Sequence, residues 1–266
     1  PLGMIRGPEG NCFGELFPVR YVSSGRDLLK SINAESTVKG RALLVGNPAF
    51  RENFPLLAMS ETDRGGNDSS NREEGFRELG NLNFSSLPGT AEEVAILRDL
   101  FMESNFEVNE LKGKVATEES TVQLCPSHEV IHFATHGFFL EGMPDGASRF
   151  ESVVSRVSQN PMFGSGLAFS GAQVTANLWK EGRVPPLESD GMLFASEVAA
   201  LGLQGTDLVV MSACETGVGK SLDGEGVLGL RRAFYAAGAG NLIMTLWPVD
   251  DRATVKVMEK FYEKYL

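Results

Sequence analysis

Short runs of apolar residues alternate along the chain with segments in which apolar residues recur every three or four positions. The runs lie at 41–46, 130–134, 207–212 and 241–246. They are nearly continuous in apolar residues, which is typical of strands covered on both faces of a sheet. Segments with helical character lie at 94–101, 117–124, 196–201, 225–237 and 250–265. This alternation predicts an α/β fold with a mainly parallel central sheet and helices on both faces.

Two segments interrupt the alternation, and one helix start carries a capping signal. Residues 60–75 hold almost no apolar side chain, which predicts a mobile surface loop. Residues 141–190 are punctuated by Gly, Pro and Ser, which predicts a long insertion. Thr90-Ala-Glu-Glu93 has the form of a capping box, in which Thr90 caps the helix and Glu93 bonds back to the Thr90 amide.

Composition narrows the classes of function. The chain has 266 residues, enough for one large α/β domain or two small ones. Its formal charge of −11 argues against broad binding to nucleic acid or to anionic membranes, both of which need a basic surface. No apolar run approaches the ~20 residues of a membrane span. The three scattered cysteines fit a reducing compartment, and we therefore expect a cytoplasmic protein.

A literal zinc-peptidase motif is present, but its context is unsuitable. His128-Glu-Val-Ile-His132 matches H-E-x-x-H, which binds zinc when both histidines share one face of a helix. Here the segment reads as a strand and meets Gly137 within ten residues. On a strand, His128, His132 and His136 would share one face but lie too far apart for one metal ion. We therefore expect no metal.

Two glycine-rich stretches resemble phosphate-binding loops only in part. Residues 217–221 resemble the tail of a P-loop, but Cys214 stands where the full pattern requires glycine. Residues 224–229 match G-x-G-x-x-G without directly following a strand. Asp223 and Glu225 would also repel a phosphate, so we expect no nucleotide cofactor.

Two reactive side chains remain, each just after an apolar strand. His136 follows the strand at 130–134, and Cys214 follows the run at 207–212. Sites in parallel sheets form beyond the carboxyl ends of strands, where a thiol beside an imidazole can act as a nucleophile. The amides of Gly137 and Cys214 could then form an oxyanion hole. Taken singly, a buried structural cysteine and a hydrogen-bonded core histidine are the commoner interpretation.

The sequence resembles the CHAT family of caspase-like cysteine peptidases from about Tyr21 to its end. The matching stretches are GRALLVGNPAF (40–50), LPGTAEEVAILRDLF (87–101), EVIHFATHGFF (129–139), NPMFGSGLAFSGA (160–172), DGMLFASEVAALGLQGTDLVVMSACETG (190–217), GEGVLGLRRAFYAAGAGNLIMTLWPVDD (224–251) and MEKFYEKYL (258–266). The resemblance implies one domain over residues 21–266, after a lead at 1–20 in which Pro1–Gly3 read as a tag remnant before Met4.

The family resemblance also implies the activity. Its histidine lies in a Thr-His-Gly like that at 135–137, and its cysteine in an Ala-Cys-Glu-Thr-Gly like that at 213–217. It thus implies a caspase-like three-layer sandwich and a cysteine endopeptidase whose dyad, His136 and Cys214, needs no third orienting residue. The expected substrate is a partner protein, and a sensor domain or a regulatory partner is expected to control cleavage, as in bacterial defence or regulated cell death.

The sequence gives weaker signals for substrate specificity, and it leaves an alternative function open. Some caspase-like peptidases place an acidic residue two before the nucleophile to bind a basic P1 side chain, but Ser212 stands there. Trp247 and Asp250, after the next strand, are the substrate-binding candidates, although acidic residues also suit the start of the final helix. The alternative function is a catalytically silent interaction module on the same fold.

Overall fold

The computed structural model describes residues 40–52, 82–140, 161–181, 190–212, 225–245 and 251–266. All of them lie within one compact unit, Glu35–Leu266. The predicted loop at 60–75, the lead at 1–20 and the candidate residues Cys214, Trp247 and Asp250 lie outside these ranges.

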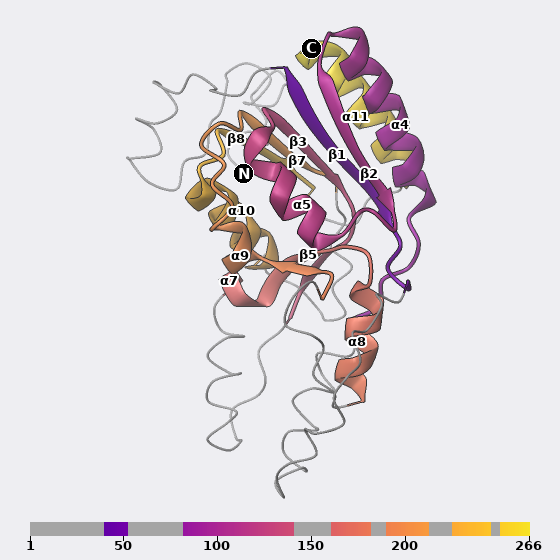
Figure 1. Ribbon diagram of the computed structural model, residues 1–266, viewed down its shortest axis with the longest axis vertical. Coiled ribbons are helices and arrows are strands. Elements are labelled where there is room, and N and C mark those ends of the chain that lie inside the picture. The colour runs from indigo at the N-terminus through magenta and orange to yellow at the C-terminus, as the bar shows by residue number, and fades with distance from the viewer. Residues whose placement is uncertain (1–39, 53–81, 141–160, 182–189, 213–224, 246–250) are drawn as a thin grey trace, which may run out of the picture. The chain divides into compact units, whose positions relative to one another are not determined.

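The described residues form a five-stranded parallel sheet of order β2-β1-β3-β7-β8 (Figure 1). Its strands are β1 (Arg41–Pro48), β2 (Glu107–Gly113), β3 (Val130–Ala134), β7 (Leu208–Met211) and β8 (Asn241–Met244). The inner strands β3 and β7 are buried at every position, as their continuous apolar runs predicted. Since all five strands run in parallel, their carboxyl ends meet at one edge of the sheet.

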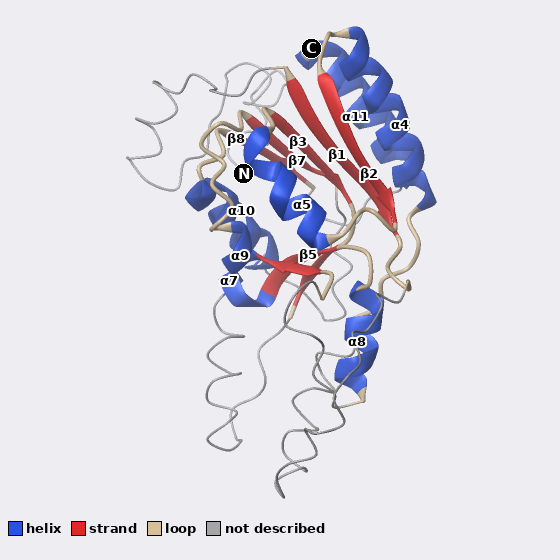
Figure 2. Cartoon of the chain, in the orientation of Figure 1, coloured by secondary structure: helices blue, strands red, loops and turns tan. Residues whose placement is uncertain are grey.

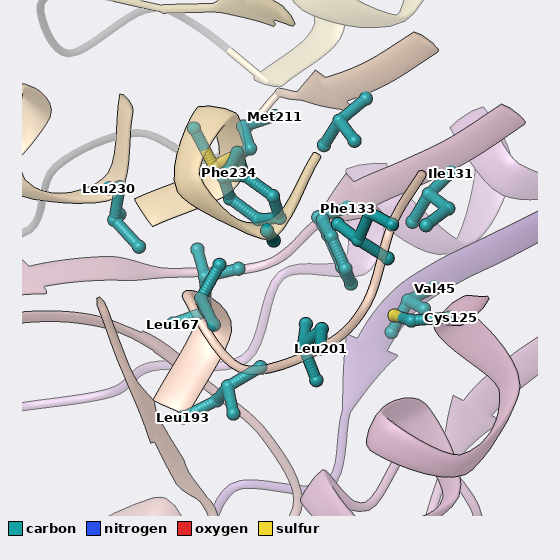
Figure 3. Packing of buried hydrophobic residues seen from close by; sticks show 14 of the residues in the cluster. Val45, Cys125, Ile131, Phe133, Leu167, Leu193, Leu201, Met211, Leu230 and Phe234 are labelled. Atoms are coloured by element: carbon teal, nitrogen blue, oxygen red, sulfur yellow. The ribbon is translucent and has the colours of Figure 1, made fainter. Parts of the chain in front are cut away.

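Helices cover both faces of this sheet, as the sequence predicted. On one face lie α4 (Pro88–Glu103) and α11 (Asp251–Tyr265) (Figure 2). These two helices pack against the side chains of alternate residues on β1, β3 and β7. On the other lie α5 (Glu118–Leu124), η2 (Cys125–Ser127), α9 (Ala195–Val198) and α10 (Glu225–Ala237). Figure 3 shows the second layer, where Phe133 and Ile131 of β3 lie near Phe234 of α10 and Cys125. The result is a three-layer sandwich.

A second, antiparallel sheet joins the carboxyl end of β3. It has the order β4-β5-β6 and consists of β4 (Gly137–Phe139), β5 (Ser165–Ala168) and β6 (Met192–Phe194). The flanking helices are α7 (Pro161–Gly164) and α8 (Ala172–Lys180). The predicted insertion at 141–190 therefore contains a strand of this second sheet and two helices.

The predicted capping box is wrong. The helix begins earlier, at Pro88, and its N-cap residue is Leu87. Thr90 instead accepts a hydrogen bond from the amide of Asn47 (2.8 Å), and Glu93 bonds to His132 of β3 (2.9 Å). Both side chains of the apparent capping pair are thus used to fix the helix on the sheet, because tertiary partners compete for the same oxygen atoms.

Candidate active site

His136 lies immediately beyond the carboxyl end of β3, at the junction of the two sheets. Its backbone carbonyl accepts a hydrogen bond from the amide of Ala168 (2.9 Å), the last residue of β5. The hydroxyl of the buried Thr135 donates to the carbonyl of the same Ala168. The backbone at 135–136 is therefore fixed against the end of β5 by two hydrogen bonds to Ala168, and a side chain on it has a defined position.

The imidazole of His136 lies between two aromatic rings and a backbone carbonyl. Its ring centroid is 5.0 Å from that of Phe50 and 5.8 Å from that of Phe84, and the residue is 2% exposed. The Nε2 atom is 2.8 Å from the carbonyl oxygen of Ser85. Because a carbonyl oxygen only accepts, Nε2 carries the proton and donates. In the neutral ring Nδ1 is then the nitrogen that can take up a proton.

The carbonyl of Ser85 is held in place by its neighbours. The amide of Phe84 donates to Oε1 of Gln173 on α8 (2.6 Å), in a buried position. Leu82 and Phe84 are buried, and Asn83 between them is exposed. Sequence reasoning missed Ser85, since a backbone carbonyl leaves no residue signature; the alternation at 82–84 was the one available sign of an extended segment there. The Ser85 carbonyl is thus a backbone acceptor for the ring of His136.

The neighbouring strand end leads toward Cys214. β3 and β7 pair in parallel with Phe133 beside Met211, and the amide of Ser212 donates to the carbonyl of Phe133 (3.0 Å). Cys214 follows Ser212 by two residues but lies outside the described ranges. Gly137 is buried at the start of β4, opposite Leu167. The roles of Cys214 and Gly137 in catalysis remain predictions.

The residues of the apparent zinc motif are used for structure. His128 bonds through Nδ1 to the carbonyl of Leu124 (2.7 Å) and through Nε2 to Asn109 (2.8 Å), and burial lowers its pKa. The carboxylate of Glu129 accepts from the amide of Gly40 (2.6 Å). The segment at 130–134 is a strand, whereas the zinc motif requires both histidines on one face of a helix.

His128, His132 and His136 do not share one environment, contrary to the expectation that they lie on a single strand face. His128 precedes β3, His132 lies within it and His136 follows it. Their ring nitrogens bond to different elements of the fold. Within the described ranges, no group of three His, Cys, Asp or Glu side chains is placed to hold a metal ion.

Two carboxyl groups with raised pKa values lie near β6, apart from His136. Glu118 at the start of α5 accepts from the amide of Gly191 (3.1 Å), and Asp190 accepts from the amide of Met192 (2.8 Å). Burial, together with the charges of Asp190 and Glu197, raises the pKa of Glu118 to about 8. Burial raises the pKa of Asp190 to about 6. At neutral pH, Glu118 is therefore largely protonated.

The five-stranded parallel sheet and its two helical layers are consistent with a caspase-like fold. The CHAT domain model matches residues 1–266. The chain therefore belongs to the CHAT family of caspase-like peptidases.

Two curated relatives show a similar but more limited match. The chain is 30% identical over 166 residues to human tetratricopeptide repeat protein 28, and 28% identical over 166 residues to the mouse protein of that name. Each match covers 59% of this chain and 6% of the relative, so the chain spans a small part of these proteins. None of the helices in the described ranges has the length and apolar character needed to cross a membrane.

Proposed function

We propose that the protein is a cysteine endopeptidase in which Cys214 is the nucleophile and His136 the acid and base. The observation that carries this proposal is the hydrogen bond from His136 Nε2 to the carbonyl of Ser85. It leaves Nδ1 as the proton acceptor, just beyond the end of β3, whose neighbour β7 ends at Met211, two residues before Ala213-Cys214. An oriented imidazole at one strand end beside a cysteine at the next is the arrangement that nucleophilic catalysis needs.

The reaction then proceeds in two halves. The Cys214 thiol gives its proton to Nδ1 of His136, and the thiolate attacks the carbonyl carbon of the scissile peptide bond. The backbone amides of Gly137 and Cys214 donate to the oxyanion. As the C–N bond breaks, Nδ1–H protonates the leaving amine, and an acyl-enzyme remains. A water molecule gives a proton to Nδ1 and attacks the thioester, which releases the acid and restores the thiol.

The packing around the ring supports this assignment. Phe50 and Phe84 keep water away from most of the imidazole, and the Ser85 carbonyl stabilises the imidazolium by accepting its Nε2 proton. The bond to the Ser85 carbonyl favours transfer of a proton from a nearby thiol, because a paired imidazolium holds the thiolate as its counter-ion.

The substrate we propose is a protein, cleaved under the control of another region or partner. The relatives are named as tetratricopeptide repeat proteins, and this chain matches only 6% of their length. Tetratricopeptide repeats are helical arrays with extended binding surfaces. Such a region attached to the peptidase would supply the signal for regulated cleavage. Trp247 and Asp250 remain the candidates for contacts with the substrate.

A catalytically silent interaction module is the second candidate. The burial of His136 favours it, since a 2% exposed histidine bonded to a carbonyl also fits a structural role. The two functions differ in the reactivity of one thiol. Iodoacetamide labelling of the intact chain, with the modified cysteine identified by mass spectrometry, tests them. In a peptidase, iodoacetamide alkylates Cys214 fast at neutral pH in the wild type and slowly in His136→Ala. In a silent module, Cys214 is alkylated at the same rate in the wild type and in His136→Ala.

A further inference from the structure

A buried polar cluster links three elements of the fold beneath the candidate site. Nε2 of His132 on β3 is 2.9 Å from Oε1 of Glu93 on α4, and Nδ1 is 3.2 Å from the hydroxyl of Tyr262 on α11. Glu93 is 2% exposed, and His132 and Tyr262 are fully buried. Because Nε2 faces a carboxylate, it donates there, and in the neutral ring Nδ1 accepts the proton of Tyr262.

Packing alone does not account for this cluster. Its surroundings are apolar: Val94 and Leu97 of α4, Val130 and Ala134 of β3, and Val210 of β7 belong to the same core. A buried pair of ionisable side chains loses hydration that its mutual attraction often only balances, and apolar residues of similar volume serve stability equally well. Besides fixing α4 on the sheet, such a pair can fix the position of a neighbouring polar group.

The neighbouring group is Ser212, at the end of β7. Its hydroxyl is 3.5 Å from Nε2 of His132, and the residue is 5% exposed. Its side chain therefore faces the buried cluster. Ser212 precedes Cys214 by two residues, and His132 precedes His136 by four. The cluster thus contacts both strands that lead to the proposed dyad.

We propose that Ser212 is a positioning residue, which the Glu93–His132 pair holds so that Cys214 meets His136 at the right distance. The inference rests on the proposed dyad. The ladder between β3 and β7 ends with the bond from the Ser212 amide to Phe133, and the chain continues from there toward Cys214. Ser212 is the last residue of this paired segment, and the contact of its hydroxyl with His132 fixes its position. Small displacements of a catalytic group cost rate strongly, since proximity supplies much of the acceleration.

The chain offers a matched pair of hydroxyl deletions for the test. Ser212→Ala and Tyr262→Phe each remove one hydroxyl that faces His132, the first on the strand leading to Cys214 and the second on α11. The measurement is the rate of iodoacetamide alkylation at Cys214 in the full chain as a function of pH, read by mass spectrometry. It needs no substrate, and thermal unfolding of each variant records any loss of stability separately.

We expect the Cys214 alkylation profile of Ser212→Ala to move to higher pH by about one unit, because the thiolate loses part of its imidazolium contact. Below the pKa of the wild-type thiol this slows alkylation about threefold, since the greater nucleophilicity of a more basic thiol offsets part of a tenfold loss of thiolate. Tyr262→Phe is expected to lose stability but to keep the wild-type profile. A shift of equal size in both variants, or none in Ser212→Ala, overturns the inference.

A second pair of variants covers the case in which Ser212→Ala does not fold. Ser212→Thr keeps the hydroxyl. Ser212→Val has nearly the same volume as Ser212→Thr but carries a methyl group in place of the hydroxyl. The inference requires the wild-type profile in the threonine variant and the shifted profile in the valine variant; the same profile in both overturns it. A wild-type Cys214 that alkylates like an ordinary free thiol overturns the dyad itself, and this inference with it. An activated wild-type Cys214 with unchanged Ser212 variants overturns only the inference.

Discussion

The imidazole of His136 donates its Nε2 proton to the backbone carbonyl of Ser85 at 2.8 Å. This bond orients the ring and decides which nitrogen can exchange a proton with a thiol. It joins the end of β3 to the extended segment before α4, 51 residues earlier in the chain. The carbonyl belongs to the backbone, so the acceptor does not depend on the side chain at position 85.

Gln173 is expected to support His136 from a distance, because it holds the segment that carries Ser85. Its Oε1 accepts from the buried amide of Phe84 at 2.6 Å. Gln173→Ala leaves this amide without its partner, which costs about 1–3 kcal/mol. We expect the free energy of unfolding to fall by that amount in denaturant titrations, and alkylation of Cys214 to slow. Ser85→Ala is the control and should match the wild type in both; a clear loss of Cys214 reactivity there would contradict the backbone assignment.

Glu118 is expected to make the protein less stable as the pH rises. Its pKa of about 8 in the folded chain lies above its ordinary value of 4.5, so the folded state binds the proton more tightly than the unfolded state. The contribution to stability is complete below pH 4.5 and is lost as the pH rises through 8. The midpoint temperature of thermal unfolding should therefore fall less between pH 6 and pH 9 for Glu118→Gln than for the wild type.

The exposed neighbour Glu119 provides the control for this prediction. It lies in the same first turn of α5, where both acidic residues face the helix N-terminus. Glu119→Gln should follow the wild-type decline with pH. An identical decline in Glu118→Gln and the wild type would show that Glu118 ionises normally.

His128 is expected to give the opposite pH dependence from Glu118, because it makes the protein less stable as the pH falls. Burial lowers its pKa below the ordinary 6.5, so the unfolded chain binds the proton more tightly. Its contribution is present above pH 6.5 and is lost as the pH falls below it. His128→Gln should be less stable than the wild type at pH 7.5, because the bonds to Leu124 and Asn109 are altered. Denaturant titrations at pH 7.5 and 5.5 should show the difference shrinking in acid; a constant difference would contradict the assignment.

The strands and most helices follow from local sequence. β3 and β7 were predictable because strands covered on both faces need continuous apolar residues. α5 begins where Thr117 caps the amide of Ser120, close to the predicted start. The edge strand β2 is harder to predict, because it keeps its ladder on one side only and carries polar residues such as Glu107 and Lys112.

The features that sequence did not predict depend on contacts between distant segments. Glu93 fits a capping box locally, but the buried imidazole of His132 binds its carboxylate instead. The strand β5 is short and glycine-containing, so it resembled part of an insertion until paired with β4 and β6. The position of His136 after a buried strand was readable, whereas its acceptor, the Ser85 carbonyl, was not.

The most direct test of the account is the pH dependence of Cys214 alkylation in the wild type and in His136→Ala. An imidazolium beside the thiol lowers its pKa from about 8.5 toward or below neutrality. We predict that alkylation of wild-type Cys214 is already near its maximum at neutral pH, and that His136→Ala has a profile near that of a free thiol. Profiles that coincide in the two proteins would contradict the dyad.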